Sequence, residues 1–386
     1  MNNVYFVNSR AIINVKDVNA GKISFFNSEL SLVNKLSMLI KKSKVLDIIE
    51  KGDIVAIKMH WGDHGTMKTI RSIYVRKLAL EIESRGGIPF ITESSGLGLF
   101  YDRTFGLGRL KIARENGYTW ETCCAPLIPL DGIKGKDYVK VKNEEGVQLK
   151  EVYVGKAIMD ADKIISLAHV KGHPRAGMGA AIKNIGVGCV GKRSKFNLHF
   201  YNEIPEIIAN ECNQCGKCTQ ICPENAIDIN NKIIINDLCS RCYGCIGACP
   251  NKAIKVEWCN AKDTNIRILD CANAVLRAKG PENFGFINFL IDISPICDCV
   301  PYNDHNVVQD IGILASKNIY AIDVASFDLI NKAPRLPDSV ATQKSGDVLS
   351  QIFSDSTGAD FRYIIDQLKK DNPENLKYNL IEIERL

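Results

Sequence analysis

Ile54-Val-Ala-Ile57 is a short apolar run that starts just after Gly52-Asp53, and it predicts a buried strand. From Thr69 to Ser84, apolar residues recur at helical spacing until the chain reaches Gly86-Gly87, which predicts an amphipathic helix. Ile88-Pro-Phe-Ile-Thr92 predicts the next strand. A strand, a helix and a strand in succession indicate a βαβ unit. We therefore expect an α/β fold built on a mostly parallel sheet with flanking helices.

The same alternation extends along the chain on both sides of this unit. Apolar runs predict further strands at Val4–Val7, Lys163–Leu167, Phe286–Ile293, Ile311–Leu314 and Ile319–Ile322. Helical periodicity predicts helices over Ser28–Glu50, Ala180–Val187, Thr264–Ala278 and Phe361–Lys369. The pattern is interrupted only in the middle of the chain, so we expect one α/β domain in two parts, residues 1–206 and residues 258–386.

Two cysteine runs fill the interruption at residues 207–257. The first reads Cys212-Asn-Gln-Cys215-Gly-Lys-Cys218-Thr-Gln-Ile-Cys222-Pro223. The second reads Cys239-Ser-Arg-Cys242-Tyr-Gly-Cys245-Ile-Gly-Ala-Cys249-Pro250 and lies 27 residues further on. Each has the spacing C-x2-C-x2-C-x3-C-P, which is typical of bacterial ferredoxins that hold 4Fe–4S clusters. The alternatives are a zinc site, which usually uses separated C-x2-C pairs, and a disulfide scaffold. We therefore expect a small α+β insert of the two-cluster ferredoxin type.

The two runs are expected to share their ligands. In two-cluster ferredoxins the cysteine before proline ligates the cluster of the other run. One cluster would then be held by Cys212, Cys215, Cys218 and Cys249. The other would be held by Cys239, Cys242, Cys245 and Cys222. Two 4Fe–4S clusters as cofactors indicate electron transfer, with an external electron donor or acceptor protein as the partner.

A second candidate site follows the expected strand at Lys163–Leu167. It reads His169-Val-Lys171-Gly-His173-Pro-Arg175-Ala-Gly177-Met-Gly179-Ala-Ala-Ile-Lys183-Asn184-Ile-Gly186. Ligands of open α/β sheets bind beyond the carboxyl ends of strands, and basic residues before a helix suit an anion. The residues expected to bind an anionic small-molecule substrate or cofactor are Lys171, Arg175 and Lys183. His173 and Lys183 are the catalytic candidates, His173 for proton transfer. The alternative is a solvated basic loop with packing glycines.

Further cysteine and histidine residues follow two of the expected strands. Cys297-Asp-Cys299 comes after the apolar run 286–293, where two thiols could bind a metal or act near a redox centre. The alternative is that they are small buried residues, a common role of cysteine. His60, in His60-Trp-Gly-Asp63-His64, is placed either for a site or as a structural histidine. The cysteines expected to be ordinary buried thiols are Cys123, Cys124, Cys189, Cys259 and Cys271.

The composition argues against several classes of protein. With 46% hydrophobic and 24% charged residues, a chain of 386 residues can bury the core of a soluble globular protein. The net charge of +5 and the lack of a basic stripe interleaved with aromatics indicate no nucleic-acid partner. No apolar run approaches the roughly 18 residues of a membrane span, and the first residues do not resemble a signal peptide. No G-x-G-x-x-G follows a strand, so no dinucleotide site of that kind is expected. We expect a cytoplasmic protein of an anaerobe, because oxygen damages exposed 4Fe–4S clusters.

These motifs together resemble a known family. Lys-x-His followed by Gly-x-Gly-Ala-Ala-Ile-Lys-Asn-Ile-Gly, the ferredoxin pair, Cys297-Asp-Cys299 and the stretch from Asp310 to Ser326 are similar to domain of unknown function 362. The resemblance implies an inserted 4Fe–4S dicluster segment and little about chemistry. The stretch from His173 to Lys183 is more distantly similar to lactate-racemase-like proteins. In that group the lysine tethers a nickel-pincer nucleotide, but Met178 and Ala180-Ala181 stand here where that group favours Ser and Gly.

Three functions are consistent with the sequence. The leading hypothesis is an iron–sulfur oxidoreductase whose two clusters relay electrons to or from an anion-binding site in the α/β domain. The first alternative is a ferredoxin-like carrier or adaptor without chemistry of its own, and the second is a lactate-racemase-like nickel-cofactor enzyme. A cavity with convergent Lys, His and Arg favours an enzyme, and a filled α/β core favours a carrier.

Overall fold

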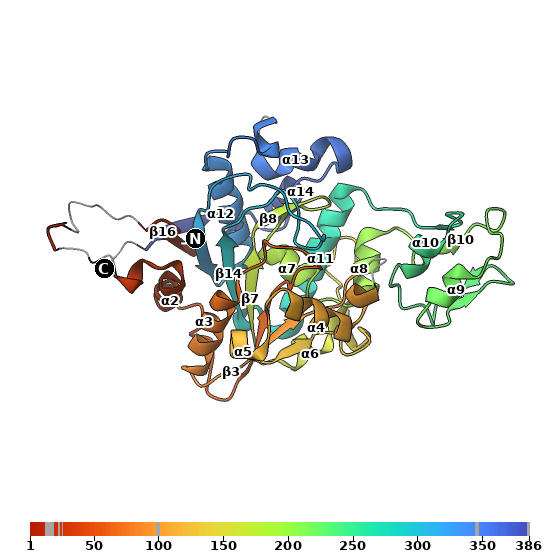
Figure 1. Cartoon of the computed structure of the whole chain (residues 1–386), viewed down its shortest axis with the longest axis horizontal. Coiled ribbons are helices and arrows are strands. Elements are labelled where there is room, and N and C mark those ends of the chain that lie inside the picture. Colours follow the sequence, from red (N-terminus) through yellow and green to blue (C-terminus); the bar gives the residue numbers. More distant parts are fainter. Residues whose placement is uncertain (12–18, 22–23, 25, 98–100, 344–346, 384–386) are drawn as a thin grey trace.

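An eight-stranded sheet forms the centre of the molecule (Figure 1). The computed structural model describes residues 1–11, 19–21, 24, 26–97, 101–343 and 347–383. The strand order is β16-β1-β15-β14-β7-β2-β3-β4. Neighbouring strands are parallel except that β15 runs antiparallel to both β1 and β14. The expected α/β fold with a mostly parallel sheet and flanking helices is confirmed.

The strands of this sheet come from both parts of the chain. They are β1 (Asn2–Asn8), β2 (Ile54–Lys58), β3 (Ile88–Glu93), β4 (Leu127–Pro129), β7 (Lys163–His169), β14 (Phe284–Leu290), β15 (Gly312–Ser316) and β16 (Tyr378–Glu382). Short two-stranded pairs lie outside it: β5 (Tyr138–Lys142) with β6 (Glu151–Gly155), β8 (Lys171–His173) with β9 (Gly177–Gly179), β10 (Glu206–Ile207) with β13 (Ile254–Lys255), and β11 (Ile227–Asp228) with β12 (Ile233–Ile234).

Helices of very different lengths connect these strands. The α-helices are α2 (Leu32–Ser43), α3 (Ser72–Glu83), α4 (Gly106–Glu115), α5 (Trp120–Cys123), α6 (Lys156–Asp160), α7 (Ala181–Gly186), α8 (Lys192–His199), α9 (Lys217–Ile221), α10 (Gly244–Ala248), α11 (Ala261–Lys279), α12 (Ile319–Lys332), α13 (Val348–Thr357) and α14 (Arg362–Asp371). Short 3-10 turns lie at Ser28–Leu30, Tyr101–Thr104, Pro281–Asn283, Val340–Gln343 and Pro373–Leu376.

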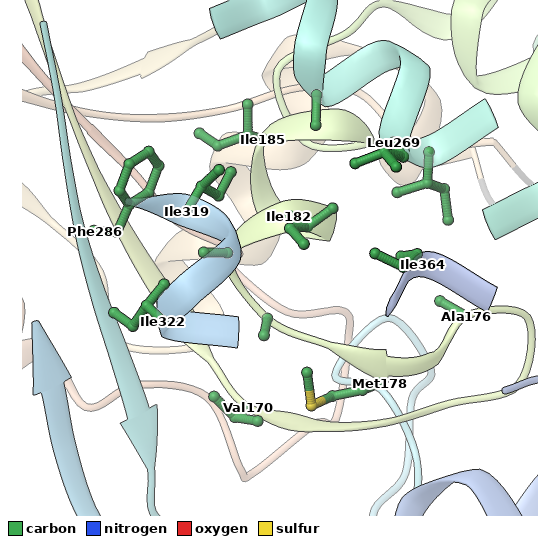
Figure 2. Packing of buried hydrophobic residues seen from close by; sticks show 14 of the residues in the cluster. Val170, Ala176, Met178, Ile182, Ile185, Leu269, Phe286, Ile319, Ile322 and Ile364 are labelled. Carbon is green, nitrogen blue, oxygen red and sulfur yellow. The ribbon is translucent and has the colours of Figure 1, made fainter. Parts of the chain in front are cut away.

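Two apolar layers cover the two faces of the sheet. Strand side chains alternate between them, so Ile165 of β7 belongs to the first layer and Ile164 to the second. Helices α2 and α3 complete the first layer, and α7, α11, α12 and α14 complete the second. Figure 2 shows the second layer, where Ile182 of α7 and Ile322 of α12 lie close to Phe286 of β14. Burying each such side chain contributes about 1.5–3 kcal/mol, so both faces hold the sheet in place.

One expected strand is wrong, and one expected helix is shorter than predicted. Ile319–Ile322 is not a strand but the first turn of α12, because the Asn318 side chain accepts from the backbone N–H groups of Tyr320 (3.0 Å) and Ala321 (2.8 Å). The expected helix over 28–50 ends at Ser43, where Lys44 takes a left-handed conformation with a φ of 56°. The other expected strands and helices are present, with bounds that differ by a few residues.

The segment with the cysteine runs has a small core of its own. That core consists of Ile207, Cys218 and Ile254, with partly buried isoleucines and cysteines of the same segment packed against it. β10 pairs with β13, so the segment begins and ends on the same two-stranded ladder. Figure 1 shows α9, α10 and β10 to one side of the molecule, away from the sheet. Within the described residues, no helix has the length and apolar character needed to cross a bilayer.

Candidate functional site

A cavity of about 440 Å³ lies where several strands of the sheet end. Lys58 of β2, Glu93 of β3 and His169 of β7 line it, each at the carboxyl end of its strand. Cys297 and Cys299 reach it from the loop that follows β14. This is the edge at which open α/β sheets bind their ligands.

The structure brings the sequence-predicted residues of the α/β domain together in this cavity. Lys171 and His173 lie on β8, Arg175 on the turn to β9, and Lys183 on α7. The turn depends on Gly177, which has a φ of 75° and whose hydrogen leaves room for the backbone of residues 360–361. His60 also lines the cavity, whereas His64 pairs with carboxylates outside it.

The cavity carries an excess of positive charge. Among the described residues that line it, seven are lysines or arginines and one, Glu93, is a carboxylate. Most of these cations already have a partner within the protein. Arg109 pairs with Glu93, and Arg103 pairs with Asp63, which lies outside the lining. Among the described residues of the lining, Lys183 is the lysine whose ammonium group makes neither a hydrogen bond nor an ion pair. An anionic ligand would therefore find Lys183 available.

Lys171 holds the loop that carries the two cysteines. Its Nζ lies 3.1 Å from Oδ2 of Asp298, which also accepts from Nδ1 of His169 at 2.9 Å. Burial alone would raise the pKa of Asp298, but the charges of His169 and Lys171 hold it below its usual value. The charge of Lys171 is therefore already compensated inside the protein, and its role in anion binding stays a prediction.

His173 presents a protonated Nε2 to the cavity. Its Nδ1 accepts from the backbone N–H groups of Arg175 (3.2 Å) and Ala176 (3.1 Å). Burial, with a smaller contribution from Lys183, lowers the pKa of His173 to about 4. The imidazole is therefore neutral near pH 7, and its single proton lies on Nε2.

The two thiols of the 297–299 loop lie beside His173. Ligand atoms of His173, Cys297 and Cys299 all lie within 4.8 Å of one another. A hydrogen bond from Cys297 lowers the pKa of Cys299 to about 5, and Arg103 and Lys183 act in the same direction against the effect of burial. Cys299 is therefore a thiolate near neutral pH.

Several buried polar atoms around the cavity lack partners within the described chain. They are Nε2 of His60, Nε of Arg103, Nε of Arg109 and Nδ1 of His199. Leaving such a group unpaired costs roughly 1–3 kcal/mol, so native proteins seldom do it without a ligand or water. The cavity is thus built for a polar occupant.

An aromatic wall closes the side of the cavity nearest the cysteine runs. Phe200 and Tyr243 stack at 5.3 Å between ring centroids and 9° between planes, and Trp258 packs against Phe200 at 4.4 Å. The guanidinium group of Arg175 lies over the Trp258 ring at 4.1 Å. All four residues line the cavity. Tyr243 lies between Cys242 and Cys245, so a cysteine run borders the cavity directly.

Tyr243 takes a conformation that suits glycine. Its φ is 75°, and the matching residue of the first run, Gly216, has a φ of 74°. A tyrosine in the left-handed region is unfavourable by about 1 kcal/mol or more and persists only where its surroundings hold it. The stacking of Tyr243 against Phe200 and Trp258 is the contact that does so.

The cysteines of the two runs lie in the small segment with its own core, and their division into two ligand sets stays a prediction. Cys212, Cys215, Cys218 and Cys249 line one small cavity of the segment. Burial, followed by the neighbouring thiols of Cys242, Cys239, Cys222 and Cys218, raises the pKa of Cys245. The cysteine before each proline accepts a backbone N–H at sulfur, from Ala226 to Cys222 (3.3 Å) and from Ala253 to Cys249 (3.2 Å). Such bonds suit thiolates that hold a cluster.

Most of the cysteines outside the two runs and the 297–299 loop are buried, and several residues of the cavity lining were not predicted from the sequence. Cys123, Cys189, Cys259 and Cys271 are buried as expected, whereas Cys124 is half-buried. Sequence reasoning missed part of the cavity lining: Lys58, Glu93, Arg103, Arg109, Lys195, His199, Phe200 and Trp258. Lys58 and Glu93 carried a usable signal, because each is a charged residue at the end of an expected strand.

The fold and the site define a class of α/β protein that has a cationic cavity at the carboxyl edge of its sheet and a cysteine-rich unit beside that cavity. The chain belongs to the family described as domain of unknown function (DUF362), which matches residues 55–328. A comparison with curated proteins found no match.

Two solved structures are remotely similar to the chain. One is the lactate racemase apoprotein from Thermoanaerobacterium thermosaccharolyticum, at 13% identity and a TM-score of 0.35, covering 66% of this chain and 48% of that one. The other is a structural genomics protein from Thermotoga maritima, at 10% identity and a TM-score of 0.35, covering 68% and 50%. The chain thus spans about half the length of each of these two structures.

Proposed function

We propose that this protein is an iron–sulfur oxidoreductase whose two 4Fe–4S clusters relay electrons to or from a cavity that binds an anionic substrate or cofactor. The observation that carries the proposal is the place of Tyr243. It belongs to the second cysteine run and also lines the cavity, so the electron-carrying unit and the substrate site share a wall.

The chain's own thiols fit the two clusters. Cys212, Cys215, Cys218 and Cys249 would hold one, and Cys239, Cys242, Cys245 and Cys222 the other, within an insert at residues 207–257. Bound there, 4Fe–4S clusters supply one-electron transfer. The first set includes Cys215, which is exposed, so an external carrier protein would dock on that side. The proposal also places the protein in a reducing cytoplasm.

The cavity provides residues for binding and for holding a proton. Lys183 supplies a positive charge whose ammonium group makes no hydrogen bond or ion pair among the described residues, and Arg175 adds a second cation at the aromatic wall. Because Nδ1 of His173 accepts from two backbone N–H groups, the neutral ring holds its proton at Nε2. These convergent groups support an enzyme over a carrier without chemistry, for which a filled α/β core would be expected.

Metal and sulfide analysis of anaerobically isolated protein tests the proposal. We expect about eight iron atoms and about eight sulfides per chain, because two clusters of four are proposed. Reduced protein should give the EPR signals of two coupled clusters. About four iron atoms per chain, or signals without coupling, would contradict the proposal. Intact-mass analysis tests the nickel-cofactor alternative, which requires an added mass on Lys183.

A Tyr243→Gly substitution is expected to keep both clusters but to shorten their lifetime in air. Iron should stay at about eight per chain, because glycine suits the left-handed conformation of this residue, as Gly216 shows. Removing the ring opens the wall between the second run and the cavity. The rate of loss of visible absorbance on exposure to air should rise, and a rate equal to that of the wild type would show that the ring shields nothing.

A Tyr201→Phe variant is the matched control for Tyr243→Gly. Tyr201 is exposed, and its hydroxyl bonds to Asp263 outside the cavity. Its absorbance should fade at the rate of the wild type. Loss of iron from the Tyr243→Gly protein as isolated would instead indicate that the tyrosine is needed for cluster assembly.

A further inference from the structure

Cys297 and Cys299 lie as a pair of thiols at the wall of the cavity. Their sulfurs lie within 4.8 Å of each other, and both residues line the cavity. Residues two apart have Cα atoms within about 7 Å, which is the separation that a disulfide can bridge. The pair is therefore placed to form an internal disulfide.

The loop that carries the pair is fixed from several sides. Asp298, between the two cysteines, accepts from His169 at 2.9 Å and pairs with Lys171 at 3.1 Å. Arg103 donates to the carbonyl oxygen of Cys299. These contacts hold the backbone, so both thiols stay turned toward the cavity.

The hydrogen bonds of His173 argue for a thiol pair rather than a metal site. Its Nδ1 accepts from two backbone N–H groups, so the neutral ring carries its proton on Nε2. A metal ion bound by Nε2 would displace that proton and leave no proton on the ring. A ring nitrogen of His173 instead lies within 4.8 Å of the Cys297 sulfur.

The two thiols are not equivalent. The positive charges of Arg103 and Lys183 act on Cys299, and Cys297 is its hydrogen-bond donor. Cys299 is therefore the better nucleophile, since the thiolate is the reactive form. A nucleophile alone would need no second thiol within reach, but disulfide exchange does, because a resolving thiol must displace the bound substrate half.

We propose that Cys299 is the attacking thiolate and Cys297 the resolving thiol of a disulfide-exchange couple whose substrate is a small anionic disulfide. Cys299 attacks one substrate sulfur, the substrate S–S bond breaks, and one substrate thiolate leaves. Cys297 gives its proton to solvent and attacks the Cys299 sulfur. The second substrate thiolate leaves, and a Cys297–Cys299 disulfide remains. The substrate has gained two electrons, and the thiol pair has lost two.

Regeneration of the pair rests on the proposed electron relay. The Sγ–Sγ bond takes up two electrons and one proton, which restores the thiol of Cys297 and the thiolate of Cys299. The electron donor is a reduced low-potential carrier protein that delivers electrons singly. The free charge of Lys183 and the cation of Arg175 account for the anionic character of the substrate.

The exchange half of the cycle can be tested without any donor. The probe is 5,5′-dithiobis(2-nitrobenzoate), a dianionic disulfide whose released thiolate is followed by its absorbance. At about pH 6.5 an ordinary thiol with a pKa near 8.5 reacts slowly, so Cys299 should dominate a fast phase. The wild-type protein should release about two thiolates per chain in this phase and retain no adduct, and peptide mass mapping should find the Cys297–Cys299 disulfide.

Serine variants assign the two roles. Cys297→Ser should release about one thiolate and keep the adduct on Cys299, and Cys299→Ser should lose the fast phase. Cys124→Ser, at a half-buried thiol outside the cavity, is the control and should behave as wild type. A wild-type protein that keeps a stable adduct, a Cys299→Ser protein that keeps the fast phase, or a single metal ion that blocks both thiols would overturn the proposal.

Iron analysis of the same samples separates this proposal from the proposed function. A normal fast phase in protein with little iron would contradict the electron relay but leave the thiol couple standing. A full iron content without a fast phase would contradict the thiol couple but leave the electron relay standing. Equal iron in the wild type and both serine variants shows that a lost fast phase is not a failure to fold.

Discussion

A chain with Cys222→Ser and Cys239→Ser together is expected to keep about four iron atoms, whereas one with Cys222→Ser and Cys212→Ser is expected to keep almost none. The reason is the crossing of ligands between the runs. Cys222 lies in the first run, but its thiol acts on Cys245 and Cys239 of the second run. Two substitutions within one ligand set remove one cluster, and two substitutions in different sets remove both.

The reciprocal pair of variants provides the control. Cys249→Ser with Cys212→Ser should keep about four iron atoms, because Cys249 lines the same small cavity as the first three cysteines of the first run. Cys249→Ser with Cys239→Ser should keep almost none. If each run held its own cluster, all four results would be exchanged. Cys271→Ala, at a buried thiol of α11, should leave the iron content at the wild-type value.

The parts of the fold that the sequence predicts are those with strong local patterns. The βαβ unit of β2, α3 and β3 follows from periodicity and glycine punctuation, and the cysteine runs follow from spacing. The run at Ile319–Ile322 fails because four apolar residues fit a strand and a helix equally well. The N-cap at Asn318 and the further apolar residues up to Ile330 decide for the helix.

Only some residues of the candidate site could be predicted from the sequence. Ionisable residues that follow a strand end, such as His173 after β7, are found because parallel strands end at one edge. Arg103 and Arg109 come from a turn and a helix after β3. Phe200 follows α8, Tyr243 lies in the cysteine segment, and Trp258 comes just after that segment. No periodic pattern in these stretches indicates a site. The ion pair of Lys171 with Asp298 joins residues far apart in sequence, so the pattern of one stretch does not show that Lys171 is already neutralised.

Lys171 is paired with Asp298, whereas the ammonium group of Lys183 has no partner among the described residues. We therefore expect opposite outcomes for Lys183→Met and Lys171→Met. Lys183→Met should weaken the binding of an anion in the cavity by roughly 10- to 100-fold, the equivalent of a charge-assisted hydrogen bond of about 1.5–3 kcal/mol. Its melting temperature should not fall, because the ammonium group of Lys183 has no partner among the described residues. Titration calorimetry with oxalate and with inorganic phosphate measures the first quantity, and thermal unfolding the second.

Lys171→Met should instead lower the melting temperature. Asp298 is buried with a carboxylate that Lys171 and His169 compensate, so removal of Lys171 costs roughly 1.5–3 kcal/mol. Any loss of anion binding in this variant should be smaller than that of Lys183→Met. Lys41→Met, at an exposed position of α2, should change neither quantity. If Lys171→Met weakened anion binding more than Lys183→Met at an unchanged melting temperature, Lys171 would be the anion-binding lysine and the ion pair with Asp298 would have no structural role.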